Sequence, residues 1–237
     1  RYNVMTQGLF ITGTDTNVGK TAVAVSILKQ SIGQRIDCRA YKPVASGVQG
    51  GLSDIERLWQ ATEKSGNRED VCPQAFQLAV APEQAAAAEE KQIDEGLLRK
   101  GLSPHGSSNF VLIEGAGGLF SPLSYQTLNV DLAREFQVPI VIVDRSHLGA
   151  IGRTLMAVTA AESVGLTVAA VVLSQTEPCH PDNPQMPDSS FVIARQAREE
   201  LQRRLPQILI CWLGYESTSI EPYVDWFKKS AHLQIPM

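Results

Sequence analysis

The chain has 237 residues, of which 43% are hydrophobic and 19% are charged, so it carries enough apolar material for a sizeable globular core. Lys and Arg number 21 against 25 Asp and Glu, and the resulting formal net charge of −4 argues against binding to nucleic acid or to an anionic membrane surface. No apolar run approaches the roughly 20 residues that cross a bilayer, and residues 1–6 lack the apolar core of a signal peptide. We therefore expect a cytoplasmic protein.

The four cysteines are far apart and form no CxxC pair; they are Cys38, Cys72, Cys179 and Cys211. This usage predicts free thiols in a reducing compartment in preference to disulfides or a zinc site. Met5 is a candidate for the natural start of the protein, with four additional residues ahead of it.

Short apolar runs rich in β-branched residues predict strands that are buried on both faces, as in a parallel sheet covered by helices. They span residues 8–12, 110–113, 138–143 and 168–173, and a further strand is expected just before Tyr41. Apolar residues at helical spacing predict helices over residues 20–32 and 154–164, the second ending at Gly165. Residues 54–62 and 82–98 are further helix candidates.

Strands that alternate with helices predict a doubly wound α/β fold with a mostly parallel sheet and helices on both faces. Residues 177–190 hold four prolines and are expected to form a surface loop within the domain. Because no linker rich in Pro, Gly or Ser divides the chain, we expect a single domain over residues 1–237, with its core at about 8–214.

The first predicted strand runs directly into GTDTNVGKT, residues 13–21, and a helix follows. This is the setting of a phosphate-binding P-loop, in which backbone N–H groups and the positive end of the helix surround phosphate oxygens. Lys20 would place its charge on the β- and γ-phosphates and Thr21 would offer a hydroxyl to Mg²⁺. Five residues separate Gly13 from Gly19, one more than in the usual motif. A chance match is disfavoured by the strand before and the helix after it.

Acidic residues stand where the carboxyl ends of strands would meet a ligand. Glu114 follows the run at 110–113 and precedes a glycine-rich stretch, so it is either a metal-directed carboxylate or a polar residue capping a strand. Asp54 begins a candidate helix, and either an N-cap or a contact with Mg²⁺ fits that position equally well. Asp144, at the end of the run at 138–143, is another candidate at this edge.

Lys42 and Ser46 belong to a turn-rich segment after the second predicted strand. A lysine there is either solvated or placed beside a triphosphate, where it would stabilise the negative charge of phosphoryl transfer. His105 and His147 lack metal-ligand spacing, which favours packing or surface roles for both.

Three stretches resemble the dethiobiotin synthetase family: GTDTNVGKT at 13–21, YKPVASG at 41–47 and EGAGGLFSPLS at 114–124. The resemblance covers residues 8–175 well and the remainder weakly. It implies a homodimeric P-loop enzyme that converts 7,8-diaminononanoate, CO₂ and Mg·ATP to dethiobiotin, ADP and phosphate. One amine would capture CO₂ as a carbamate, the carbamate would attack the γ-phosphate, and the second amine would close the ring.

The resemblance also implies roles for individual residues. Lys20 and Lys42 would be catalytic and stabilise anionic phosphate and carbamate, while Ser46, with Lys42, would contact the diamine or its carbamate. Mg²⁺ would be held by Thr21, Asp54 and Glu114. The implied nucleotide contacts are Thr16, Asn17, Val18, Gly19, Lys20, Thr21, Asp54, Glu114, Gly117 and Gln175. The 121–124 segment and the helix near 148–151, the latter from the partner subunit, would shape the substrate site.

The chain departs from the family pattern at several positions. Asn17 replaces a frequent Glu, Ser174-Gln175 stands for the pair that contacts adenine, and Gly152-Arg153 replaces a frequent Asn-His pair. Residues from about 209 onward, within the segment that would hold the base, depart most.

Three other classes compete with this interpretation. Amide-forming ligases of the same fold usually carry a glutaminase domain, for which 237 residues leave no room. ATPases that act by dimerisation or partitioning generally place a second lysine early in the loop, as in KGGxGK, and residues 14–17 contain none. An inactive homologue is disfavoured because Lys20, Thr21, Lys42, Asp54 and Glu114 are all present.

Overall fold

A computed structural model describes residues 6–48, 53–178 and 190–234. Met5, Cys179 and most of the predicted loop at 177–190 lie outside the described residues. The described strands are β1 Gln7–Gly13, β2 Cys38–Tyr41, β3 Phe110–Gly118, β4 Ile140–Arg145, β5 Val168–Ser174, β6 Leu209–Leu213, β7 Ile220–Glu221 and β8 Ala231–His232. The described helices are α1 Lys20–Gly33, α2 Asp54–Ala61, α3 Arg68–Val71, α4 Pro82–Ala88, α5 Leu97–Lys100, α6 Asn129–Phe136, α7 Ala150–Ser163, α8 Ser190–Arg204 and α9 Trp226–Lys229, with a 3₁₀ turn at Ser103–His105.

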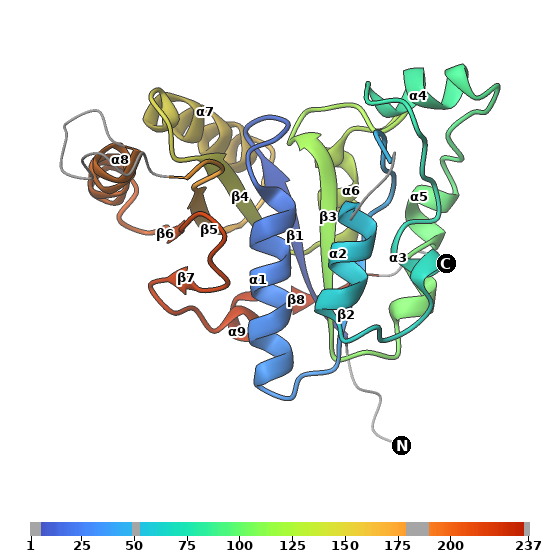
Figure 1. Ribbon diagram of the computed structural model, residues 1–237, viewed down its shortest axis with the longest axis horizontal. Coiled ribbons are helices and arrows are strands. Elements are labelled where there is room, and N and C mark those ends of the chain that lie inside the picture. The colour runs from blue at the N-terminus through green and yellow to red at the C-terminus, as the bar shows by residue number, and fades with distance from the viewer. Residues whose placement is uncertain (1–5, 49–52, 179–189, 235–237) are drawn as a thin grey trace.

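The strands form one sheet in the order β2-β3-β1-β4-β5-β6-β7. β1 to β6 pair in parallel, while β7 is antiparallel to β6 and β8 is antiparallel to the start of β1. The predicted doubly wound α/β fold is confirmed. In Figure 1, α1 and α2 lie in front of this sheet, and the carboxyl ends of β1 and β3 point to the top of the view.

Alternate residues of each strand enter two separate hydrophobic clusters, one on each face of the sheet. Leu9 and Ile11 of β1 belong to the cluster that contains α1, α2 and α9, whereas Phe10 belongs to the one that contains α6, α7 and α8. Because both faces are covered, the strands must be apolar throughout, which explains their continuous hydrophobic runs.

The strand order reverses at β1, since β3 lies on one side of it and β4 on the other. In open α/β sheets such a switch point leaves a crevice outside the carboxyl ends of the strands. The loop after β1 and the last residues of β3 and β4 therefore converge at the same place.

The predicted helix over 82–98 is wrong, because α4 ends at Ala88 and α5 begins only at Leu97. Glu90 has a positive φ of 55°, which breaks the helix, and the Asp94 carboxylate accepts a hydrogen bond from the Leu97 N–H at the start of α5. Residues 89–96 thus form a connection of turns and irregular backbone. The Ala-rich composition predicted helix there but not where it ended.

Other elements differ from the sequence predictions in length or were not predicted. β3 continues through the glycine-rich stretch, so Glu114 lies within the strand, opposite Ile11 of β1, and not after it. α7 begins at Ala150, four residues before its predicted start, and ends at Ser163. Gly165, where the helix was predicted to end, follows it with a left-handed φ of 79°. The sequence analysis did not predict α3, α6, α8, α9, β6, β7 or β8.

Cys38, Cys72 and Cys211 are free and buried, as predicted, and burial raises the pKa of each thiol to about 12. His105 packs beneath Tyr41, 5.7 Å between ring centroids, and burial lowers its pKa. His147 is exposed. These positions match the packing and surface roles predicted for the two histidines.

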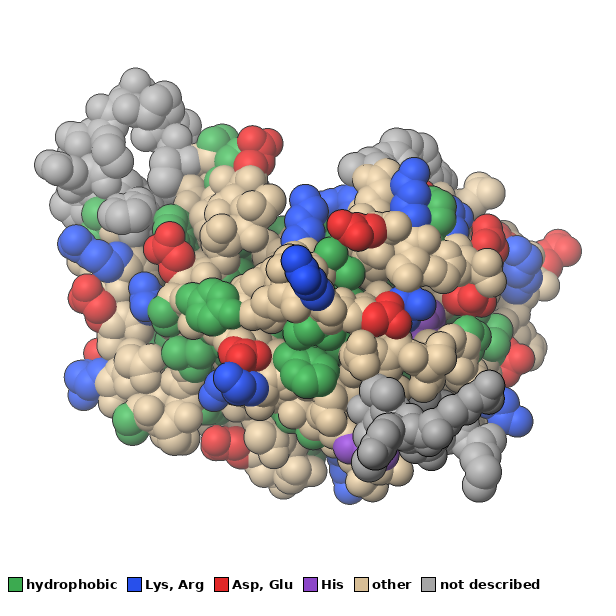
Figure 2. All heavy atoms as spheres, turned by 90° about the horizontal axis from the view of Figure 1, so that it is seen from below, with side chains coloured by type: hydrophobic (Ala, Val, Ile, Leu, Met, Phe, Trp, Pro, Cys, Tyr) green, Lys and Arg blue, Asp and Glu red, His purple; other side chains and the backbone are tan. Residues whose placement is uncertain are grey.

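Figure 2 views the molecule from the side at which β1 and β3 begin. Acidic and basic side chains of the described residues are interspersed over this face. None of the helices in the described part is both long enough and apolar enough to span a membrane.

Candidate active site

A cavity of about 1310 Å³ opens at the carboxyl ends of the central strands. The predicted site residues that line it are Thr16, Asn17, Gly19, Lys20, Thr21, Lys42, Ser46, Asp54, Glu114, Gly117 and Gln175. Val18 is the exception, because its side chain is buried in the core beneath the loop. The fold therefore brings segments that are far apart in the chain to one cavity.

The loop between β1 and α1 presents an uncapped helix start to the cavity. Gly19 precedes α1 with a φ of 92°, no side chain caps this end, and the first turn contains no acidic residue. A Cβ at position 19 would lie 2.3 Å from the Ser174 Oγ, so glycine is required both by conformation and by space. The exposed N–H groups and the positive end of the helix dipole make this an anion-binding end.

Lys20 folds back over the loop, where its Nζ donates a hydrogen bond of 2.8 Å to the Asp15 carbonyl oxygen. The side chain is buried, and this burial, together with the nearby charge of Lys42, lowers the pKa of Lys20 although Glu114 acts in the opposite direction. A bound anion such as a phosphate would favour the charged form of this lysine.

Beside the loop, Glu114 of β3 is 1% exposed and lies within an ion pair. Its Oε1 is 2.5 Å from the Nζ of Lys42 and accepts a hydrogen bond of 2.9 Å from the Thr21 Oγ1. Burial acts to lower the pKa of Lys42, but Glu114 and Asp54 outweigh it and raise that pKa. Lys42 is therefore a buried ammonium group and not a solvated one.

Asp54 opens α2 but is not its N-cap, which was one of the two roles that the sequence left open. Ser53 is the cap and accepts the hydrogen bond of the Glu56 N–H at 3.3 Å. The Asp54 carboxylate instead lies 3.0 Å from the Lys42 Nζ. Burial acts to raise the pKa of Asp54, yet the charge and hydrogen bond of Lys42 hold it below its ordinary value.

The oxygen atoms around Lys42 have the chemistry that Mg²⁺ prefers. Glu114 Oε2 is buried and has no hydrogen-bond partner, and the hydroxyl of Thr21 and the carboxylate of Asp54 face the same hollow. Residues 6–48, 53–178 and 190–234 contain no cluster of three or more His, Cys, Asp or Glu side chains. The set thus fits a cation that takes its remaining ligands from phosphates and water, and it does not form an all-protein cage.

Asn129, which the sequence analysis missed, holds the glycine-rich end of β3 in place. Its Nδ2 donates to the carbonyl oxygens of Ala116 at 2.6 Å and Gly118 at 2.8 Å. A Cβ on Gly115 would lie 2.3 Å from the Asn129 Oδ1, so this glycine makes room for the amide. A single asparagine 13 and 11 residues away from these two partners gives no sequence signal of this role.

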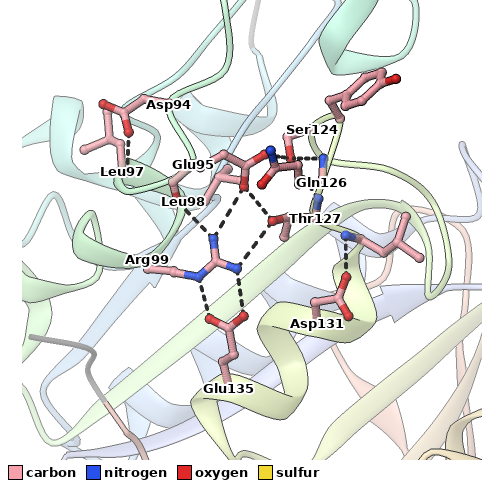
Figure 3. Close-up of polar contacts among 12 residues, drawn as sticks. Asp94, Glu95, Leu97, Leu98, Arg99, Ser124, Gln126, Thr127, Asp131 and Glu135 are labelled. Carbon is pink, nitrogen blue, oxygen red and sulfur yellow. Dashed lines mark hydrogen bonds and ion pairs between the residues drawn. The ribbon is translucent and has the colours of Figure 1, made fainter.

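Ser121 and Pro122 form a wall of the cavity, and a network of polar contacts holds the turn that follows them. Figure 3 shows the Glu95 carboxylate accepting hydrogen bonds from Ser124 and, at 2.6 Å, from Thr127. Arg99 contacts Glu95 and makes a two-pronged ion pair with Glu135 of α6, at 2.5 and 2.7 Å. Glu95, in the connection between α4 and α5, and Arg99 of α5 therefore hold the turn at 124–127 in place.

The remaining predicted residues divide between the cavity and the core. Ser46 is half-buried at the cavity, and the Gln175 Nε2 donates to the Glu177 carbonyl oxygen at 3.0 Å. Asp144 does not reach the cavity, since it is fully buried and holds the hydroxyl of Thr14. The cavity also includes Arg57, which the sequence analysis did not single out, and residues 214–218, which lie in the segment that was expected to hold the base. Arg57 lies one helical turn after Asp54 and therefore on the same face of α2, so its position at the cavity could have been predicted from the sequence.

Comparison with known proteins agrees with this fold. An AAA domain family, AAA_26, matches residues 7–217. The chloroplast FtsY of Physcomitrella patens shares the fold, with a TM-score of 0.50 and 12% identity over 94% of this chain and 64% of that one. Together with the loop before α1, these matches define the chain as a P-loop nucleotide-binding protein.

Two curated relatives narrow the class to a family. The ATP-dependent dethiobiotin synthetase BioD of Anaeromyxobacter dehalogenans is 36% identical over 208 residues, which cover 87% of this chain and 90% of the relative. The ATP-dependent dethiobiotin synthetase BioD of Rhodopirellula baltica is 40% identical over 189 residues, or 71% and 72% of the two chains. The chain belongs to the dethiobiotin synthetase family.

The buried ion pair makes a prediction about stability. Replacing Lys42 by Met leaves the Glu114 charge buried without its partner, so the free energy of unfolding in urea at neutral pH should fall by about 3–5 kcal/mol. Lys91→Met, which removes a lysine exposed at the surface beside Glu89, should cost less than about 1 kcal/mol. The double variant Lys42→Met/Glu114→Gln should recover part of the loss. A Lys42→Met protein as stable as the wild type would show that Lys42 does not compensate the buried charge of Glu114.

Proposed function

We propose that the protein is a dethiobiotin synthetase, a ligase that carboxylates 7,8-diaminononanoate and closes its ring with CO₂ and Mg·ATP, giving dethiobiotin, ADP and phosphate in biotin biosynthesis. The observation that carries the proposal is that the P-loop, Lys42 and Ser46 line one cavity. The phosphates of a nucleotide and a second substrate can therefore meet there. Membership of the synthetase family supplies the reaction.

The chemistry asks the protein mainly to position reactants and to balance charge. A carbamate formed from one amine and CO₂ attacks the γ-phosphorus with its oxygen, and the bond to the bridging oxygen of ADP breaks. The second amine then attacks the carbonyl carbon of the resulting carbamic-phosphoric anhydride. That step expels phosphate, releases a proton and completes the cyclic urea.

The residues of the site suit these steps in distinct ways. The N–H groups at the start of α1 and the ammonium group of Lys20 would bind the β- and γ-phosphates. The buried ammonium group of Lys42 would stabilise the carbamate and the anionic phosphoryl group as charge moves between them. Thr21, Asp54 and Glu114 would hold Mg²⁺, which neutralises phosphate charge when bound. Ser46 would hydrogen-bond to the diamine or its carbamate.

The nucleotide end of the cavity involves the segments that depart most from the family pattern. Gln175 and residues 214–218 line it, and we propose that they contact the base, with Thr16, Asn17, Gly19 and Gly117 at the phosphates and ribose. The side chain of Val18 is buried, so its contribution would come from its backbone alone.

A homodimer of one-domain subunits completes the proposal. Leu148 and Met156, at the start and the middle of the α7 region, are 78% and 67% exposed. We propose that these exposed apolar side chains contact a partner subunit, and residues 148–151 would reach the partner's substrate site from there.

The decisive experiment follows phosphate release with Mg·ATP and bicarbonate, with and without 7,8-diaminononanoate, and detects dethiobiotin by mass. We expect release that depends on the diamine and equals the product formed. Lys20→Ala should abolish both because alanine cannot offset the triphosphate charge, whereas Lys100→Ala, an exposed lysine of α5, should leave both unchanged. Hydrolysis indifferent to the diamine, without product, would point to a regulatory ATPase or a ligase with another substrate.

Glu114→Gln should weaken the binding of Mg²⁺. Removing one charged oxygen ligand is expected to raise the Mg²⁺ concentration for half-maximal turnover, and for Mg²⁺-dependent nucleotide binding, by about tenfold or more. Glu162→Gln, an exposed residue near the end of α7, is the matched control. An unchanged metal titration would remove Glu114 from the ligands of Mg²⁺.

Ser46→Ala separates the two substrates. Loss of one hydrogen bond should raise the KM for the diamine by about fivefold to tenfold while the KM for ATP changes little. Ser163→Ala, at the far end of α7, serves as the control. A larger effect on ATP than on the diamine would assign Ser46 to the nucleotide instead.

A further inference from the structure

Asp144 is a charged side chain that the proposed chemistry does not use. It ends the buried part of β4, is fully buried and does not line the cavity. A buried carboxylate remains charged only where hydrogen bonds and an opposite charge replace water. The contacts of Asp144 therefore indicate which segments of the structure this charge holds together.

Both oxygen atoms of Asp144 are engaged. Oδ1 accepts hydrogen bonds from the Thr14 Oγ1 at 2.6 Å and the Arg145 N–H at 2.9 Å. The Arg153 Nε lies 3.1 Å from Oδ1 and 3.2 Å from Oδ2. The Thr154 hydroxyl lies 3.5 Å from Oδ2. One carboxylate thus joins the loop after β1 to the first turns of α7.

Arg153 reaches this carboxylate from the first turn of α7 and fastens the preceding turn as well. Its Nη1 donates to the Leu148 carbonyl oxygen at 3.2 Å. Gly149 has a φ of 89°, and a Cβ there would lie 2.9 Å from the same Nη1, so the turn leaves space for the guanidinium group. Arg153 is one of the two residues that replace the family's frequent Asn-His pair, and the structure gives it a defined partner.

Thr14 is the last residue before the exposed part of the P-loop, and hydrogen bonds to β4 hold it in place. Its N–H donates to the Val143 carbonyl oxygen at 2.9 Å, and its hydroxyl holds Asp144. Residues 15–17 are exposed, and Asn17 has a φ of 55°. The conformation of this strained stretch depends on how firmly its two ends are held. At the far end, Gly19 packs against Ser174.

We propose that Asp144 and Arg153 are positioning residues for nucleotide binding, in which Arg153 holds Asp144, and Asp144 holds Thr14 at the start of the P-loop. The proposal rests on the proposed function only in that the loop binds a nucleotide. Neither side chain touches the substrates. They keep the N–H groups of the loop directed at the phosphates, and they connect the start of α7 to the nucleotide site.

A double-mutant cycle in nucleotide affinity tests the chain of contacts. The variants are Thr14→Val, which keeps the shape and removes the hydroxyl, Arg153→Met, and the two together; Arg203→Met, an exposed arginine of α8 paired with Glu200, is the control. Affinity for Mg·ADP is measured by titration calorimetry on folded protein. Each single variant should bind Mg·ADP about tenfold more weakly than the wild type. The double variant should bind it little more weakly than either, because both substitutions break the same series of contacts from Arg153 through Asp144 to Thr14.

A hundredfold loss in the double variant, the product of the two single effects, would overturn the proposal, because the residues would then act independently. Unchanged affinity in either single variant would overturn it too. Arg153→Lys should recover part of the affinity, and the KM for the diamine should move less than that for ATP, which a general loss of structure would not produce. If Arg153→Met does not fold, Arg153→Lys takes its place in the cycle.

The cycle is independent of turnover. A wild-type protein that binds Mg·ADP and shows the coupling, but forms no dethiobiotin, would refute the proposed function and leave the positioning roles supported. A protein that forms dethiobiotin and shows no coupling would do the reverse.

Discussion

The arrangement of the site depends on the burial of one negative charge, that of Glu114. A carboxylate with 1% exposure in the central strand β3 destabilises the fold unless positive charge and hydrogen bonds replace its water. Lys42, which follows β2, supplies the charge, and Thr21 of α1 supplies a hydroxyl. Meeting this requirement brings the ends of two strands and the first turn of the P-loop helix together. The wall of the cavity that carries Glu114, Lys42 and Thr21 lies where those elements meet.

Two buried carboxylates flank the loop after β1, and their environments differ in a way that separates their roles. Glu114 retains a buried oxygen without a hydrogen-bond partner and faces the cavity. Asp144 has hydrogen bonds to both oxygens and faces away from it. An oxygen that is desolvated and unpartnered favours a cation, whereas a fully satisfied carboxylate stabilises one conformation. The same residue class thus serves reactivity on one side of the loop and rigidity on the other.

The rest of the cavity is held by contacts between segments that are distant in sequence. Asn129 fixes the glycine-rich end of β3, and Glu95 fixes the turn after the wall formed by Ser121 and Pro122. Asn129 satisfies carbonyl groups at the end of a strand, and Glu95 satisfies hydroxyl groups in a turn. These polar contacts add to the burial of Leu119 and Leu123, which anchor the same segment in the hydrophobic core.

The sequence by itself determined the fold class, the P-loop and the family, because these are recorded in local patterns. A strand buried on both faces must be apolar throughout, and a loop that binds phosphate needs glycine, lysine and a helix start in fixed order. Lys20, Thr21 and Glu114 stood out for the same reason, whereas the predicted roles of Ser46, Gly117 and Gln175 came from the resemblance to the family. The end of α4 and the late elements α8 and β6 were not found, since a helix boundary or a strand with weak periodicity depends on what packs against it.

Only the tertiary structure decided how those residues are paired. Asp54 could have capped a helix, and Asp144 could have faced the ligand. In the structure Asp54 contacts Lys42, which follows β2, and the register of β4 against β1 places Asp144 beside Thr14. Arg153, Asn129 and Glu95 act on partners that lie nine or more residues away. Contacts of that range leave no periodic signal in a single sequence. They exist only because the order of strands in the sheet places the two ends of each contact side by side.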